Sequence, residues 1–286
     1  MLYNDSRHRE GGSELKYKVQ YSCISHIGKC RTMNQDNYSC GGLYMKAGED
    51  SPCMTLTGYI SLEKYNIVGI FDGMGGEECG EVAALIAAEE ASKLTVDKEP
   101  VNELLNFCKR ANERICSYQQ EHGVLAMGTT AALLAFTKKE IGLCNIGDTK
   151  IFRFADGSLE QLSADHYGAA VHGRKPPLSQ NLGIPPSLIV IDPYVARGVY
   201  NKGDIYLLCS DGLTDMVELD AVKTILVEKQ FEKAAEELVN KALENGGKDN
   251  VTVILCRVEA NNKGLFKKLF ESKKPIDMKE ANKNGK

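Results

Sequence analysis

Four aspartates share one pattern, in which an apolar, strand-like run ends and a small or turn-forming residue adjoins the carboxylate. They are Asp72 in Phe71-Asp72-Gly73, Asp148 in Gly147-Asp148, Asp211 in Ser210-Asp211-Gly212, and Asp249 in Lys248-Asp249-Asn250. One Asp-Gly pair usually marks only a turn. Four at strand ends can share one rim of packed sheets, where their carboxylates repel one another unless cations neutralise them. Oxygen ligands without His or Cys favour Mg²⁺ or Mn²⁺ over zinc, so the pattern indicates a site for hard divalent cations.

The segment around Asp72 predicts a strand, a glycine-rich turn and a helix. Residues 66–71 are apolar β-formers, and residues 81–94 are almost all Ala, Val, Leu, Ile and Glu. Glycines at 73, 75 and 76 let the backbone bend and expose carbonyl oxygens beside the carboxylate. A dinucleotide loop is disfavoured because Glu78 stands where the third glycine belongs, and no Lys-Ser or Lys-Thr of a Walker loop follows. The chain also lacks the Gly-x-Ser-x-Gly motif of serine hydrolases.

Hydrophobic periodicity along the rest of the chain predicts short strands and a few helices. Strands are expected at residues 17–23, 54–60, 65–71, 131–136, 141–146, 150–154, 158–162, 188–191, 205–209 and 251–258. Helices are expected at 81–94, from Pro100 onward, and twice between Gly212 and Gly247. Strands 54–60 and 65–71 are expected to pair, whereas the polar residues 30–38 by themselves predict a loop. Such short strands at close intervals indicate antiparallel sheets.

Composition is that of a soluble globular protein with a large core. The 286 residues are 43% hydrophobic and 26% charged, and the net charge of −4 gives no basic field for nucleic acid. No apolar run is long enough for a membrane span, and the first residues lack the apolar centre of a signal peptide. Ten cysteines are scattered without a Cys-x-x-Cys pair, which favours reduced core cysteines and a cytoplasmic protein.

The two ends of the chain differ from its centre. Residues 1–14 are polar and are expected to be a disordered N-terminal segment, followed by one catalytic domain at 15–260. Residues 261–286 hold eight lysines against three acidic side chains. We expect this basic segment to be a mostly disordered tail, with docking to a membrane surface or a partner as the alternative.

Seven motifs, taken together and in order, carry a resemblance to a known family. They are Arg31 with Asn34-Gln35-Asp36-Asn37; Phe71 to Gly76 with Gly80-Glu81; Gly128-Thr129-Thr130; Asn145-Ile146-Gly147-Asp148; Leu162-Ser163-Ala164-Asp165-His166; Cys209-Ser210-Asp211-Gly212-Leu213; and Asp249-Asn250-Val251-Thr252. Over about residues 17–259 the chain resembles the metal-dependent protein phosphatases of the type 2C class. The resemblance implies an α+β fold, the αββα sandwich, in which two packed antiparallel sheets are flanked by helix pairs.

The resemblance also implies roles for individual residues. Asp72 would bridge two Mn²⁺ or Mg²⁺ ions, with the Gly73 carbonyl on the second ion and Asp211 and Asp249 on the first. Asp36 would orient metal-bound water, and Asp148 with Asp211 resembles the third-metal site of bacterial members. Arg31 would bind the substrate phosphate, for which its planar fork is suited. The catalytic residues implied are therefore Arg31, Asp36, Asp72 and Asp211.

The implied reaction is the hydrolysis of phosphoserine and phosphothreonine in proteins. A hydroxide activated by the metals attacks phosphorus directly, without a phosphoenzyme. The implied partners are phosphoproteins, with a serine/threonine kinase opposing the enzyme, which we expect to be a monomer. Alternatives are a non-catalytic regulatory module on the same fold and a phosphatase of small phosphorylated molecules.

Two departures from the family pattern affect this interpretation. Met74 occupies a position that is His in many eukaryotic members and commonly Met in bacterial ones, which favours a bacterial-type enzyme. After His166 only 16 positions lead to Leu182-Gly183, where the family usually has a longer flap beside the active site. We therefore expect a shortened flap, a more open cleft and an altered choice of substrate.

Overall fold

The computed structural model describes residues 17–48, 55–74, 79–170, 173 and 175–261. The predicted disordered segment 1–14, most of the predicted basic tail, and Gly75 and Gly76 of the predicted turn lie outside the described residues. No helix within the described ranges is long and apolar enough to cross a membrane.

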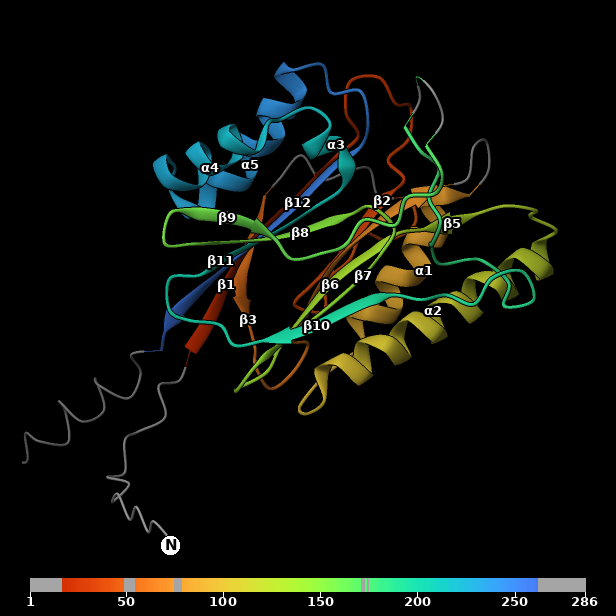
Figure 1. The fold of residues 1–286 in the computed structure, drawn as a ribbon, viewed down its shortest axis with the longest axis horizontal. Coiled ribbons are helices and arrows are strands. Elements are labelled where there is room, and N and C mark those ends of the chain that lie inside the picture. Colours follow the sequence, from red (N-terminus) through yellow and green to blue (C-terminus); the bar gives the residue numbers. More distant parts are fainter. Residues whose placement is uncertain (1–16, 49–54, 75–78, 171–172, 174, 262–286) are drawn as a thin grey trace, which may run out of the picture.

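Two antiparallel sheets form the centre of the molecule (Figure 1). The first, here sheet 1, has the order β3 (Leu56–Ile60), β1 (Tyr17–His26), β12 (Val251–Ala260), β11 (Ile205–Cys209), β8 (Lys150–Ala155) and β9 (Ser158–Gln161). The second, sheet 2, has the order β10 (Tyr194–Gly198), β7 (Ile141–Ile146), β6 (Ala131–Phe136), β4 (Ile67–Met74) and β2 (Asp36–Cys40), while the short β5 (Gly128–Thr129) pairs with the end of β4.

Helices cover the outer face of each sheet (Figure 1). Helices α1 (Gly80–Ser92) and α2 (Pro100–His122) pack on sheet 2, and α4 (Leu219–Glu228) and α5 (Phe231–Glu244) pack on sheet 1, preceded by the short α3 (Asp211–Thr214). A third apolar layer, which includes Val68, Ile70 and Ile254, fills the space between the sheets. The αββα sandwich predicted from the sequence is therefore confirmed.

Alternation along β4 determines where its carboxylate points. Successive side chains of a strand point to opposite faces. Ile67 and Phe71 contact the helices, with the Phe71 and Phe107 ring centroids 6.0 Å apart, whereas Val68 and Ile70 lie between the sheets. Asp72 has the same parity as Val68 and Ile70, so its side chain belongs to the inter-sheet layer, at the rim where that layer opens.

Three predicted features of the secondary structure were wrong. The strand at 56–60 pairs with β1 and not with β4, whose neighbours are β2, β5 and β6. Residues 36–38, the end of the predicted loop 30–38, belong to the buried strand β2. Residues 188–191 form no strand; the neighbouring edge strand β10 begins at Tyr194.

These errors have physical reasons. Strand β2 buries the polar Asn37 by satisfying its side chain: Asn37 donates to the Met45 carbonyl at 3.0 Å and accepts from the Met45 amide at 3.1 Å. Its sequence therefore shows no apolar alternation. Residues 188–190 are apolar but exposed, Leu188 by 75% and Val190 by 77%, so their hydrophobicity reflects no sheet burial.

Candidate active site

The predicted acidic residues meet in a cleft at one end of the sandwich. A cavity of about 310 Å³ is lined by Arg31, Asp72, Gly73, Asp148, Asp211 and Asp249. Asp72 and Gly73 come from sheet 2, Asp211 and Asp249 flank strands of sheet 1, and Asp148 lies in the β7–β8 connection that passes between the sheets. The expectation that these strand ends share one rim agrees with this geometry.

Asp36 and Asp72 are direct partners in the register of β2 and β4. Both point into the inter-sheet layer, but Asp36 is more deeply set and is only 3% exposed. Its Oδ2 accepts hydrogen bonds from the Ser210 and Thr252 hydroxyls, each at 2.7 Å. Because those hydroxyls belong to sheet 1, the Asp36 carboxylate connects the two sheets beneath the cleft. It borders a neighbouring cavity and does not itself line the acidic one.

The buried carboxylates are electrostatically unfavourable in the absence of cations. Burial raises the pKa of Asp36 to about 7, although hydrogen bonds from Thr252 and Ser210 lower it. Burial, followed by repulsion from Asp36, Asp211 and Asp148, raises the pKa of Asp72 well above its usual range. Among the described residues, none donates a hydrogen bond to the Asp72 carboxylate; only its backbone is engaged, by Thr129 and Thr130.

The ends of β11 and β12 bring the remaining ligand candidates together. The two strands are antiparallel, with Cys209 opposite Val253, so the residues after β11 and before β12 lie at the same end. Asp211 is the first residue of α3, and Asp249 precedes β12. Gly212 permits this approach, because a Cβ at that position would lie 2.0 Å from the Asn250 carbonyl oxygen.

Arg31 is held at the cleft by Asn250. The Asn250 amide donates to the carbonyls of Ile27 at 2.8 Å and Met33 at 3.0 Å, and its oxygen accepts from the Gln35 amide at 2.8 Å. These bonds fix the loop that carries Arg31. The Arg31 guanidinium contacts Asp249 Oδ2 at 2.7 Å and remains about half exposed, so it can turn toward a ligand in the cleft.

Lys175 is a cleft residue that the sequence reading did not identify. Its ammonium forms ion pairs with Asp211, with Asp148 at 2.9 Å and with Asp215 at 3.3 Å. Burial lowers the pKa of Lys175, but the attraction of Asp211 and Asp148 outweighs this and raises the pKa overall. No pattern marked this lysine, because it lies in a Gly- and Pro-rich loop that reaches the cleft only in the folded chain.

Ser210, Thr252 and Asn250 were recognised only as parts of motifs. Their contacts show that they position Asp36 and the Arg31 loop. Ser210 stands beside Asp211 in sequence, which gave a partial signal, but the partner that Ser210 shares with Thr252, Asp36, is more than 170 positions away from either. The shared target of these hydroxyls could not be read from spacing.

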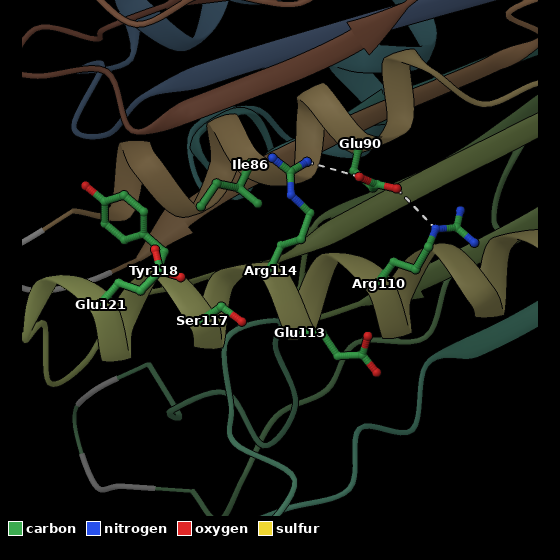
Figure 2. Close-up of a pocket in the computed structure, with 8 residues that line it drawn as sticks. All are labelled: Ile86, Glu90, Arg110, Glu113, Arg114, Ser117, Tyr118 and Glu121. Carbon is green, nitrogen blue, oxygen red and sulfur yellow. Dashed lines mark hydrogen bonds and ion pairs between the residues drawn. The ribbon is translucent and has the colours of Figure 1, made fainter.

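The larger cavities are less suited to this chemistry. The pocket between α1 and α2, of about 560 Å³, contains Arg110 and Arg114 (Figure 2). Both guanidinium groups are already paired with Glu90, at 3.1 Å and 3.0 Å, and Arg114 also contacts Glu89. A third cavity, of about 630 Å³, lies beside the cleft and is lined by apolar side chains such as Met33, Met45 and Leu85 together with polar ones.

Comparison with known families agrees with the geometry of the cleft. The family model described as protein phosphatase 2C matches residues 46–247. The chain belongs to the protein phosphatase 2C family. Because the matched residues include Asp72, Asp148 and Asp211, most of the acidic cleft lies within the region that defines the family.

Two relatives of this protein phosphatase 2C chain, both from bacteria, align with most of it. It is 32% identical over 207 residues to the serine/threonine protein phosphatase PstP of Mycobacterium tuberculosis, covering 67% of this chain and 40% of the relative. It is 30% identical over 221 residues to the serine/threonine phosphatase stp of Listeria welshimeri, covering 69% of this chain and 86% of the relative. The aligned region thus spans less than half of PstP but most of stp.

Solved structures of the same family share the fold. A crystal structure of the M. tuberculosis phosphatase PstP superposes with a TM-score of 0.70 at 25% identity, covering 85% of this chain and 99% of the solved one. The catalytic domain of PstP in complex with two manganese ions superposes with a TM-score of 0.69 at 26% identity, with 85% and 99% covered.

The donor set of this protein phosphatase 2C cleft fits oxygen-preferring divalent cations. Five carboxyl groups, including that of Asp36, are accompanied by the cations Arg31 and Lys175, and Asp72 has no donor among the described residues. Among the described residues, no three acidic side chains lie close enough together to form a metal-binding group. Arg31 instead engages Asp249, so metal loading requires that ion pair to rearrange, whereas Asp148 and Asp211 are paired with Lys175.

Proposed function

We propose that the chain is a metal-dependent phosphatase that hydrolyses phosphoserine and phosphothreonine in proteins. The observation that carries this proposal is the convergence of Asp72, Asp148, Asp211 and Asp249 from both sheets on one cleft that Arg31 borders. The names of the bacterial relatives support the substrate class. Retention of every acidic residue argues against a regulatory module, since a protein without bound cations gains nothing from repelling carboxylates.

Asp72, the Gly73 carbonyl, Asp211 and Asp249 would hold two Mn²⁺ or Mg²⁺ ions, with Asp148 at the edge of the site. Such ions, when bound, lower the pKa of water and stabilise charge on the phosphoryl group. Two features of the chain suit this arrangement. Asp72 has no hydrogen-bond donor to lose among the described residues, and Gly73 packs so closely on the Gly80 and Gln35 carbonyls, at 2.3 Å and 2.5 Å from an added Cβ, that a side chain would displace the strand.

Arg31 binds the substrate phosphate in this proposal. Its guanidinium leaves Asp249 and donates two parallel hydrogen bonds to phosphoryl oxygens, a geometry that a planar fork favours. Asp36 accepts a hydrogen bond from the attacking water through the oxygen that Ser210 and Thr252 do not engage. The two hydroxyls keep that carboxylate in one orientation, so the water is directed at phosphorus in line with the leaving serine or threonine oxygen.

The first test compares Asp72→Asn with the wild type in hydrolysis of p-nitrophenyl phosphate with Mn²⁺, Mg²⁺ or a chelator. Loss of outer-shell groups at metal sites typically costs about 10–100-fold, so loss of a direct ligand is expected to lower turnover by more than about 100-fold. The chelator is expected to abolish turnover of the wild type.

Asp156→Asn is the matched control for the same chemical change. Asp156 lies at the β8–β9 turn with a φ of 50°, a conformation that asparagine also adopts. The activity of the Asp156→Asn variant is expected to equal that of the wild type. Turnover of Asp72→Asn at the wild-type rate, or full activity in chelator, would contradict the metal-dependent assignment.

Substrate class is tested with phosphoserine and phosphothreonine peptides beside small phosphomonoesters. Preference for the peptides in kcat/KM is expected. Exclusive turnover of small phosphate esters would favour the small-molecule phosphatase, and no turnover of any substrate by folded, Mn²⁺-loaded protein would favour the regulatory module.

The cellular setting is part of the same proposal. We place the enzyme in the cytoplasm as a monomer, opposing a serine/threonine kinase. The cysteines support a reducing compartment: the nine within the described residues are free, and the Cys108 and Cys144 thiols, with sulfurs 3.5 Å apart, share a hydrogen bond and form no disulfide. A shortened flap and a more open cleft remain part of the proposal; the described residues of 166–182 include no helix.

A further inference from the structure

Lys175 supplies a cation to the acidic cleft from the connection between β9 and β10. The connection is fastened on both sides of the lysine: Gly168 donates to the Pro177 carbonyl at 2.7 Å, and Ser179 donates to the His166 carbonyl at 2.9 Å. Pro176 and Leu178, which follow Lys175, also line the cleft. The lysine is therefore presented by an anchored backbone, and its position does not depend on the side chain alone.

The surroundings of the Lys175 ammonium match its bonding capacity. An ammonium group has three N–H donors. Among the described residues, the Lys175 ammonium forms ion pairs with three carboxylates, those of Asp148, Asp211 and Asp215. The Asp148 side chain is 6% exposed and that of Asp211 is 19% exposed, whereas Asp215 is 50% and Lys175 is 40% exposed, so the ammonium is shielded from water on the Asp148 side and open to it on the Asp215 side. Tyr167 completes the environment by donating its hydroxyl to Asp148 at 3.2 Å.

We propose that the Lys175 ammonium is a resident cation of the cleft, which holds Asp148, Asp211 and Asp215 together and excludes a further divalent ion from that position. Three carboxylates that share one ammonium partner attract a hard cation with oxygen preference once that ammonium is removed. An ammonium tethered to the chain neutralises them at any metal concentration. The inference rests on the metal dependence proposed above and limits the cleft to two divalent ions.

Removing Lys175 leaves three carboxylates facing one space without a cation. Repulsion between them is then relieved by binding of a divalent ion, for which they provide oxygen ligands. Lys175→Ala is therefore expected to convert the position into a metal site. Lys175→Arg retains a charge at the same place and is expected to keep divalent ions out.

The test counts Mn²⁺ ions bound per chain by equilibrium dialysis and elemental analysis. Two ions are expected for the wild type and three for Lys175→Ala. The double variant Lys175→Ala/Asp148→Asn is expected to return to two, which would assign the additional ion to the Asp148 position. Lys202→Ala, which changes an exposed lysine in the turn before β11, is the matched control and is expected to bind two.

Circular dichroism of each variant establishes that it is folded. If Lys175→Ala does not fold, Lys175→Met retains the hydrocarbon stem and provides the same comparison. Equal numbers of ions in the wild type and the neutral Lys175 variants, whether two or three, would overturn the inference while leaving the phosphatase proposal intact. Absence of Mn²⁺ binding in every variant would overturn both.

Discussion

At the scale of single residues, the proposed mechanism separates groups that would serve chemistry from groups that would serve only position. Arg31 and Asp72 face the space where a phosphate and cations would bind, whereas Asn250, Ser210 and Thr252 never need to contact a ligand. The positioning contacts are short and buried, and their acceptors lie far away in sequence. The proposed function of the cleft therefore also rests on residues that carry no reactive group.

Arg31 provides the first prediction at this scale. A hydrogen bond to a charged group contributes about 1.5–3 kcal/mol, so Arg31→Ala is expected to lower kcat/KM for a phosphopeptide by about 10–100-fold. Arg31→Lys keeps the charge but loses the fork, and it is expected to restore only part of the activity.

Steady-state kinetics at saturating Mn²⁺ measures this effect. Arg197→Ala, on the edge strand β10, is the control and is expected to leave kcat/KM unchanged. Since Arg31 also contacts Asp249, Mn²⁺ affinity is measured in parallel. An Arg31→Ala variant with wild-type kcat/KM would exclude Arg31 from phosphate binding.

At the scale of elements, turns that approach one another closely decide whether the cleft forms. Gly28 has a φ of +84°, and a Cβ there would lie 2.2 Å from the Asp249 carbonyl oxygen. The turn after β1 and the turn before β12 are therefore in direct backbone contact. Lys29 strengthens this contact by donating its amide to the Gly247 carbonyl at 2.7 Å.

Gly28→Ala is predicted to destabilise the protein much more than Gly157→Ala. Gly157 has a similar φ of +76°, but nothing lies within 4 Å of an added Cβ. Gly157→Ala therefore adds only left-handed strain, about 1–2 kcal/mol. Gly28→Ala adds a backbone clash and is expected to cost more than about 3 kcal/mol, in the upper range for single substitutions.

Urea unfolding of the two variants, with and without Mn²⁺, makes the comparison. Gly28→Ala is also expected to weaken Mn²⁺ binding, because the clash displaces Asp249. Equal losses of unfolding free energy in the two variants would show that the close contact between the two turns does not contribute to stability.

At the scale of the whole molecule, the cleft joins the two halves of the sandwich. Asp72 extends from sheet 2, and Asp211 and Asp249 extend from sheet 1. Ions shared between them would connect the sheets as the Asp36 hydrogen bonds already do. In the absence of ions the same carboxylates repel one another across the inter-sheet space.

Metal is therefore predicted to stabilise the whole fold. At 100 times the dissociation constant, a ligand that binds only the folded state adds about 2.7 kcal/mol. Mn²⁺ is expected to raise the melting temperature of the wild type, and a chelator is expected to reverse the rise.

Asp72→Asn is expected to melt higher than the wild type without metal, because a repelling charge is removed, and to gain little from Mn²⁺. Differential scanning calorimetry of both proteins with and without Mn²⁺ checks both effects. Equal Mn²⁺-dependent shifts of the melting temperature in the two proteins would show that Asp72 is not a metal ligand.

The sequence by itself predicted the family, the four layers, most helices and strands, and five acidic residues that the structure brings together at or beneath one cleft. These features depend on local signals: Asp beside Gly at a strand end, helical spacing from Pro100 onward, and motifs that keep their order. Alternation along β4 also determined that Asp72 shares a face with Val68 and Ile70.

Only the tertiary structure decided the partners of these elements. Strand β2 is polar in sequence and becomes a buried strand because β4 satisfies its backbone and Met45 satisfies Asn37. Strand β3 pairs with β1 and not with β4, because pairing depends on which edges meet and not on nearness in sequence. Lys175 became a residue of the cleft because its loop folds back over β7 and β11. Each of these outcomes arises from contacts between distant segments, which no local pattern encodes.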